Sequence, residues 1–103
     1  MRRRSIDFRA IAAAALSHAD TIMPRWLPDG RREGPEWVAR NPKRTDHRRG
    51  SFKVNLSSGK WGDFASGNFG GDLVSLAAFL FDIKQPEAAL RIADMLGISP
   101  YER

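Results

Sequence analysis

The stretch between residues 51 and 72 constrains the fold more than any other part of this chain. Apolar and polar side chains alternate over its first six residues, and a period of two predicts a half-buried β-strand. A turn-forming segment at 57–59 separates this run from a second strand-like run at 60–64, so the two runs predict a β-hairpin. Glycines then interrupt regular structure before a helix that Asp72 is suited to cap. The apolar positions of the first run are Phe52, Val54 and Leu56.

A helical pattern precedes this stretch. It predicts one helix that begins after Ser5 or Asp7 and ends at Pro24, because the residue before a proline is pushed out of helical geometry. The apolar stripe of this helix, at helical spacing, consists of Ile11, Ala15, Ala19 and Ile22.

Two helical patterns follow the hairpin. The first begins at Asp72, and the second runs from Pro86 to Gly97, which sits where a left-handed residue closes a helix. With a short strand at 36–40, the elements predict an α+β fold: a small antiparallel sheet of about three strands, one helix before it and two after it. We expect a single domain over 1–103, which divides into an N-terminal helix and lead-in (1–26), the sheet with a basic loop (27–71) and a helical pair (72–98).

Composition limits the possible classes of protein. An apolar content of 42% and a charged content of 28% indicate a globular chain, and the apolar run at 11–16 is far too short to cross a bilayer. The chain contains no Cys, which excludes disulfides and thiolate zinc sites, and we expect a cytoplasmic location. Neither a signal peptide nor contact with a membrane is expected.

No catalytic constellation is evident in the sequence. Its two histidines have no pattern that pairs them with a serine and an acid, and the carboxylates form no cluster of the kind that two-metal nucleotidyl transfer needs. The glycines before Asp72 resemble a phosphate-binding loop, but the Gly-Lys-Ser/Thr of such a loop is missing and the carboxylate would repel phosphate. We therefore expect no catalytic residue, no cofactor and no small-molecule substrate.

Positive charge is concentrated in the middle of the chain. Residues 25–60 carry ten basic and four acidic groups, a net charge of +6, whereas residues 61–103 have a net charge of −3 and residues 1–24 of +2. The three parts sum to the +5 of the whole chain. A basic middle beside an acidic end is typical of a protein with one face toward a polyanion.

Aromatic residues are interleaved with these basic groups. Cations on the backbone and aromatic faces under the bases are how proteins hold single-stranded nucleic acid. Phe52 is expected in the core, Trp26 and Trp37 are expected to pack, and for Trp61 two roles remain open: covering the edge of the sheet or stacking on a base. The residues expected to contact nucleic acid are Arg40, Lys43, Arg44, Arg48, Arg49, Lys53, Lys60 and Trp61.

Residues 37–98 also carry an ordered set of motifs. These are Asn41-Pro42, then Gly-Ser-Phe-Lys-Val at 50–54, Trp-Gly-Asp-Phe-Ala-Ser at 61–66, Gly-Gly-Asp at 70–72, and Glu-Ala-Ala at 87–89 through Leu-Gly-Ile at 96–98. The set resembles the N-terminal zinc-ribbon domain of DnaG-type bacterial and phage primases, which carries a Cys-His-Cys-Cys ribbon. The lead-in at 27–34 is similar to that of phage and plasmid primase-helicases.

The chain departs from this family at the zinc ligands. The four ligand positions fall on Asn41, Arg44 (or Thr45), Asp63 and Ser66, and none of them is Cys or His. Zinc prefers thiolate and imidazole ligands, so we expect no metal and a zinc-ribbon-like fold without zinc. A polar network of the Asn, Asp and Ser, with Arg44 pairing Asp63, is expected to tie the loops that zinc would tie.

The resemblance implies a function in DNA replication. In the family this domain engages the single-stranded DNA template, and polymerisation belongs to a separate domain. We therefore expect a non-catalytic template-binding module of a phage- or prophage-type primase or primase-helicase, as part of a longer protein. Its expected partners are single-stranded DNA and the primase catalytic or helicase domain. The alternative is a protein–protein interaction module of a replication complex, in which the sheet or the third helix docks another protein and the basic loop only confers solubility.

Overall fold

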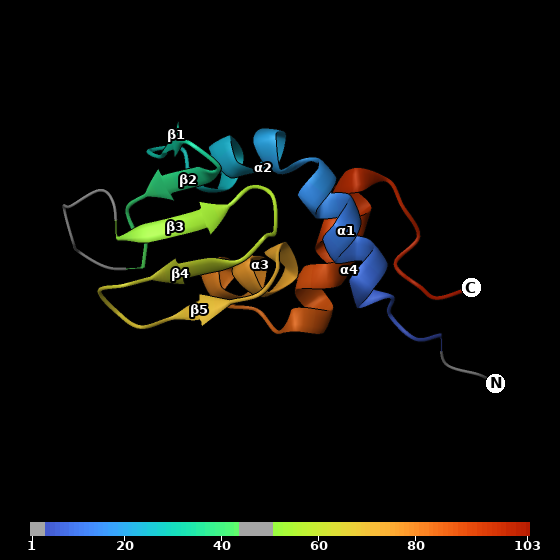
Figure 1. Cartoon of the computed structure of the whole chain (residues 1–103). Coiled ribbons are helices and arrows are strands. Elements are labelled where there is room, and N and C mark those ends of the chain that lie inside the picture. The colour runs from blue at the N-terminus through green and yellow to red at the C-terminus, as the bar shows by residue number, and fades with distance from the viewer. Residues whose placement is uncertain (1–3, 44–50) are drawn as a thin grey trace.

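The computed structural model of the chain describes residues 4–43 and 51–103. The sheet occupies one end of the molecule, and α1 and α4 occupy the other (Figure 1). In chain order the elements are α1 (Phe8–Ser17), α2 (Ala19–Trp26), β1 (Arg31–Glu33), β2 (Glu36–Ala39), β3 (Phe52–Asn55), β4 (Trp61–Asp63), β5 (Phe69–Gly70), α3 (Leu73–Phe81) and α4 (Gln85–Leu96). None of the helices in the described ranges has the length and apolar composition that crossing a membrane requires.

The first predicted helix is divided into two. Asp7 caps α1, since its side chain accepts a hydrogen bond from the Ala10 N–H at 3.1 Å, and the chain bends at His18 before α2 begins. The predicted end at Pro24 is wrong, because α2 continues through this proline to Trp26. The last turn brings the next residue, Leu27, into the core at 1% exposure, and we attribute the continuation to this burial, which outweighs the local preference of proline.

The sheet is an antiparallel meander with the strand order β1-β2-β3-β4-β5. The predicted hairpin is present, with Phe52 opposite Asp63 and Val54 opposite Trp61. The short strands β1 and β5 were not predicted. The first has only exposed polar side chains, and the second has only two residues, so neither shows the alternation that marks a strand.

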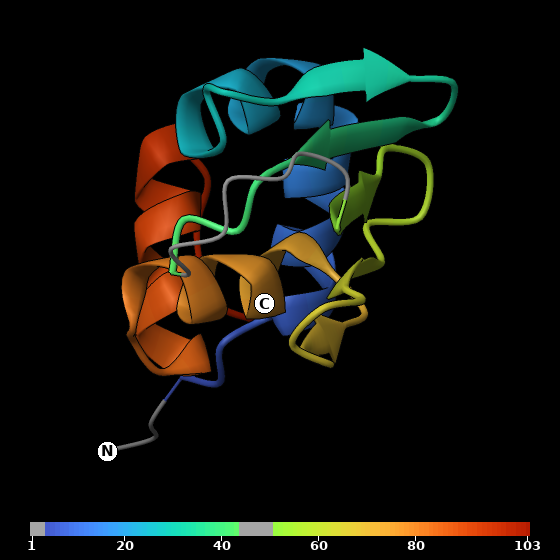
Figure 2. The same cartoon turned by 90° about the vertical axis from the view of Figure 1, so that its left-hand side faces the viewer.

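One face of the sheet forms the core with the helices. Figure 2 looks along the molecule from the sheet end and shows the helices gathered on one side of the sheet. Phe52 is fully buried on this side, as predicted, and the ring of Phe79 from α3 lies 6.1 Å from its ring and 5.0 Å from that of Trp61. Gly70 allows this packing, because a Cβ there would lie 2.5 Å from Trp61 Nε1.

The two C-terminal helices form as predicted. Asp72 accepts a hydrogen bond from the Ser75 N–H at 2.8 Å and makes a capping box at the start of α3. Gly97 closes α4 in the left-handed conformation, with a φ of 70°. The chain ends are joined by an isolated bridge between Ile6 and Tyr101 at the helical end of the molecule.

Candidate nucleic-acid interface

The strand register shows which residues lie on the outer face of the sheet, the face opposite the core. Alternate residues of a strand face opposite sides, so directly opposed residues form rows across the sheet. One row crosses all five strands, and a second row runs parallel to it, two residues away along β1, β2 and β3. The first row is Arg31, Val38, Lys53, Gly62 and Phe69, and the second includes Glu33, Glu36, Asn55 and Lys60.

Two phenylalanine rings project from the end of this face. Phe64, directly after β4, is 84% exposed, and Phe69 in β5 is 82% exposed. The ammonium group of Lys53 lies 5.8 Å from the centre of the Phe64 ring. Large apolar side chains with this exposure have a cost in water, and a pair of them beside a cation indicates a binding surface.

A shallow hollow of about 540 Å³ lies between these side chains. Gly62 forms part of its lining, opposite both Lys53 and Phe69 in the register, and its lack of a side chain leaves the space between them open. The hollow is also lined by Lys60, Phe64 and Asn68. It combines flat apolar surfaces, two cations and amide groups, with the carboxylate of Glu36 also in the lining. Apolar rings beside cations are the chemistry needed to hold a base and its phosphate.

The positive charge in the lining of the hollow comes from two of the predicted residues. Lys53 and Lys60 both line the hollow, and in the described part of the chain no carboxylate lies within ion-pair distance of either. Arg31, in contrast, is paired with Glu33 at 3.0 Å. The two lysines are therefore the cations of the face that a phosphate would meet without competition from an ion pair.

Two of the other predicted cations, Arg40 and Lys43, do not line the hollow. Arg40 is exposed just after β2, with its Nε 3.8 Å from an oxygen of Asp29. Arg44, Arg48 and Arg49 lie outside the described residues.

Trp61 is a core residue, which corrects its expected place among the stacking contacts. Its side chain points to the inner face, is 7% exposed and lies 5.9 Å from the ring of Phe52. The indole N–H donates to the hydroxyl of Ser75 in α3 at 3.0 Å. Of the two roles open for this residue, covering the sheet is the one that the structure supports, because a base has no access to a ring held between the sheet and α3.

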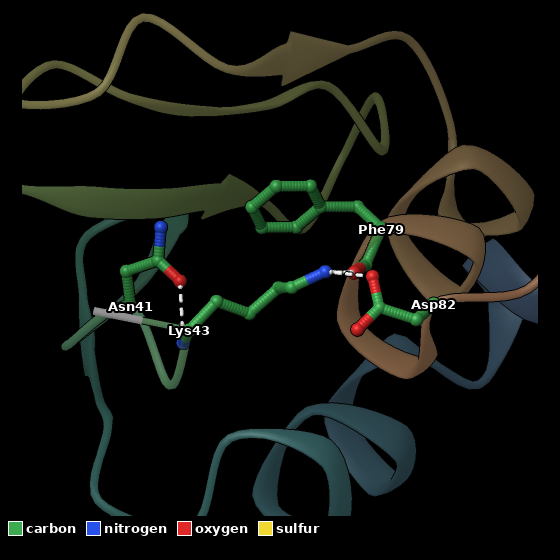
Figure 3. Close-up of polar contacts among 4 residues, drawn as sticks. All are labelled: Asn41, Lys43, Phe79 and Asp82. Atoms are coloured by element: carbon green, nitrogen blue, oxygen red, sulfur yellow. Dashed lines mark hydrogen bonds and ion pairs between the residues drawn. The ribbon is translucent and has the colours of Figure 1, made fainter.

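Lys43 belongs to a second cluster, at the end of α3. Its ammonium group donates to the Phe79 carbonyl at 2.9 Å, forms an ion pair with Asp82 and lies 4.9 Å from the centre of the Phe79 ring (Figure 3). A cation at this place satisfies a terminal carbonyl of the helix and interacts favourably with its dipole. Lys43 is thus engaged within the protein, although it was predicted to contact DNA.

The predicted network of Asn41, Asp63 and Ser66 is present. The amide Nδ2 of Asn41 and the hydroxyl of Ser66 each donate to Asp63 Oδ2 at 2.8 Å. The backbone N–H of Ala65 donates to Asp63 Oδ1 at 3.0 Å, and that of Lys43 donates to Asn41 Oδ1 at 2.9 Å. Asn41 and Asp63 are each 2% exposed. The predicted pairing of Asp63 with Arg44 lies outside the described residues.

These hydrogen bonds change the acidity of Asp63. Burial by itself raises the pKa of the carboxyl group, because it disfavours the charged form. The hydrogen bonds from Asn41, Ser66 and the Ala65 N–H favour the carboxylate, and they lower the pKa from 3.8 to about 2. Asp63 is therefore an anion at neutral pH although it is buried.

Sequence reasoning missed the exposed rings. Neither Phe64 nor Phe69 is among the residues that the sequence analysis expects to contact nucleic acid. A signal was available in both cases. Phe64 has the opposite strand parity to Trp61, and Phe69 stands between Asn68 and Gly70 without an apolar neighbour in sequence.

Comparison with known proteins adds a structural relative. No family model matches the sequence, and no curated protein matches it significantly. Among solved structures, the crystal structure of the zinc-binding and RNA polymerase domains of the Aquifex aeolicus primase matches with a TM-score of 0.74 and 25% sequence identity. The match covers 92% of this chain and 22% of that chain, so this chain spans about a fifth of the length of the structure it matches.

The chain shares its fold with a part of this primase structure. The match confirms the expected α+β class and supports a primase-related module.

The matched primase structure includes a zinc-binding domain, and zinc binds thiolate, imidazole and carboxylate ligands. Asn41, Asp63 and Ser66 supply an amide, a carboxylate and a hydroxyl, and both carboxylate oxygens already accept hydrogen bonds. Within residues 4–43 and 51–103, no group of three or more His, Cys, Asp or Glu side chains is placed to hold a metal. This set of donors does not fit zinc.

Proposed function

We propose that the chain is the single-stranded DNA-binding module of a DNA primase, without catalytic activity of its own, and that the outer face of the sheet is its binding surface. The observation that carries this proposal is the pair of exposed rings, Phe64 and Phe69, which line one hollow together with Lys53 and Lys60. The structural match to a bacterial primase supports the replication context.

The arrangement suits a single strand better than a duplex. The hollow is shallow and lies on a short sheet, and its rings are free to stack on bases that are not already stacked in pairs. Lys53 and Lys60 stand beside the rings, where they would neutralise phosphates of the same strand. Primer synthesis would then be the work of another domain, which this module would supply with template.

The two rings allow a direct test by substitution. Phe64→Ala and Phe69→Ala should each weaken binding of a labelled single-stranded DNA 12-mer by about 1–3 kcal/mol, or roughly 5- to 150-fold, because each removes one stacking surface. Fluorescence anisotropy at low salt measures the affinity. Since both side chains are more than 80% exposed, the melting temperature should stay within a few degrees of the parent value.

Phe8→Ala is the matched control, because this phenylalanine is 39% exposed on α1 at the helical end of the molecule. It should leave DNA affinity unchanged. Equal losses in all three variants, or unchanged affinity in the two sheet variants, would contradict the proposal. Competition with unlabelled duplex of the same sequence tests the preference for a single strand.

A further inference from the structure

The hydrogen-bonded group of Asn41, Asp63 and Ser66, of which the first two are buried, lies at the base of the segment that carries both exposed rings. Asp63 ends β4, Phe64 follows it directly, and Phe69 begins β5 after a tight turn. The Gly67 N–H donates to the Asp63 carbonyl at 2.8 Å, and the Asp63 N–H donates to the Asn68 carbonyl at 2.8 Å. The conformation of this turn therefore depends on groups that belong to Asp63 itself.

The same group continues into two other segments. Asn41, in the loop after β2, donates to Asp63 and accepts from the Lys43 N–H. Lys43 in turn donates to the Phe79 carbonyl and pairs with Asp82 at the end of α3 (Figure 3). A continuous chain of hydrogen bonds thus links the β4–β5 turn, the loop after β2 and the C-terminus of α3.

We propose that this chain of hydrogen bonds, centred on the anionic Asp63, fastens the three segments together without a metal and so positions Phe64 and Phe69 for binding. The amide of Asn41 is suited to this role because it presents a donor to the carboxylate and an acceptor to the backbone at once. A zinc ion would require ligand atoms with free electron pairs at these places. Here, instead, the N–H of Asn41 and the O–H of Ser66 donate hydrogen bonds to the same carboxylate oxygen of Asp63.

Asp63 is in this view a positioning residue that touches no DNA. Its burial at 2% exposure makes the charge-assisted hydrogen bonds strong and their loss costly. Of the two parts of the inference, only the effect on DNA rests on the proposed function, and the fastening of the turn can be measured in the protein alone.

The first experiment compares Asp63→Asn with Asp7→Asn by amide hydrogen exchange in the 103-residue chain. Both variants lose one carboxylate, but Asn caps a helix as well as Asp does, so the control should leave exchange unchanged. Asp63→Asn should speed exchange of the Ala65 and Gly67 amides by roughly tenfold or more, because the turn loses a charge-assisted acceptor. Unchanged exchange at these amides would overturn the proposal, whatever the protein does with DNA.

The second experiment asks whether Asn41 and Asp63 act through each other. In a cycle with Asn41→Asp, Asp63→Asn and the double variant, the exchanged pair can again form an amide–carboxylate hydrogen bond. The double variant should recover part of the protection and part of the melting temperature that each single variant loses. Strictly additive losses would overturn the proposal, since they would show that the two side chains act independently.

The third experiment tests whether the three segments are held together without a metal ion. The purified chain should contain much less than one equivalent of zinc by elemental analysis, and its melting temperature should not change when a chelator is added. One tightly bound zinc per chain, with loss of stability on chelation, would overturn the proposal. If the parent protein shows these properties and the exchange pattern but binds no single-stranded DNA, the proposed function fails and the fastening role stands.

Discussion

The indole N–H of Trp61 donates a hydrogen bond to the hydroxyl of Ser75, and this bond holds the tryptophan on the core side of the sheet. Trp26 and Trp37 are also packed. The ring centre of Trp26 lies 5.7 Å from that of Phe81, and the indole N–H of Trp37 donates to the Leu27 carbonyl at 3.1 Å. The aromatic surface open to a ligand is therefore made of phenylalanine, which has consequences for how binding can be observed.

Tryptophan emission of the parent protein should change little when single-stranded DNA is added, because none of the three indoles lies on the outer face. A Phe64→Trp variant should behave differently, since its new indole replaces a ring that is 84% exposed beside Lys53. We expect clear quenching of this variant by a short oligonucleotide. Strong quenching of the parent protein, with none added by the new indole, would place the ligand elsewhere.

Salt dependence should report the two lysines of the hollow. Lys53→Ala together with Lys60→Ala should weaken binding and reduce the magnitude of the negative slope of log affinity against log salt by roughly 1.4, about 0.7 for each phosphate contact to a single strand. Arg9→Ala with Lys84→Ala removes the same charge from the helical part of the molecule. A slope that falls equally in both double variants would indicate a general effect of net charge rather than contacts in the hollow.

Gly62 offers a way to fill the hollow without touching the core. A Cβ at this position would meet the Cβ of Phe69 at 3.6 Å, an ordinary contact, so Gly62→Ala should fold normally. Gly62→Leu should keep the fold but place a branched side chain between Lys53 and Phe69, and we expect its DNA affinity to fall more than that of the alanine variant. Circular dichroism and anisotropy titrations of the pair check both statements.

Asp63 should make the free energy of unfolding depend on pH in the acid range. Its pKa is lowered to about 2 in the folded state from 3.8, so the unfolded chain takes up the proton first as the pH falls. The carboxylate therefore contributes about 2 kcal/mol above pH 4 or so, and this contribution disappears as the pH falls from about 4 toward 2. Urea unfolding of the parent and of Asp63→Asn should show a difference that shrinks over this range, whereas a constant difference would contradict the assignment.

The sequence predicted those parts of the fold in which local signals and burial agree. Alternation at Phe52 and Val54, the cap at Asp72 and the left-handed Gly97 each mark an element that the structure contains. The break at His18 and the continuation through Pro24 were not predictable in this way, because the packing of residues on either side decides them. Edge strand β1 has no apolar pattern, since neither face of it is buried.

The sequence predicted the two lysines of the candidate site but not its two exposed phenylalanines. Lys53 and Lys60 follow from strand parity alone, because their neighbours Phe52, Val54 and Trp61 face the core. Assigning the stacking role to Trp61 ignored the same parity. The role of Lys43 could not be predicted from the sequence. Its partner Asp82 lies 39 residues away, and nothing in the sequence indicates that the two side chains meet.

The bridge between Ile6 and Tyr101 has a practical consequence. Further hydrogen bonds, from the Asp7 N–H to the Pro100 carbonyl at 2.9 Å and from the Glu102 N–H to the Ser5 carbonyl at 2.8 Å, bring the first and last segments together at the helical end (Figure 1). An affinity tag, a dye or an immobilising linker attached at either end would leave from the side opposite the β4–β5 turn, so surface-based assays can present the outer face of the sheet to solution.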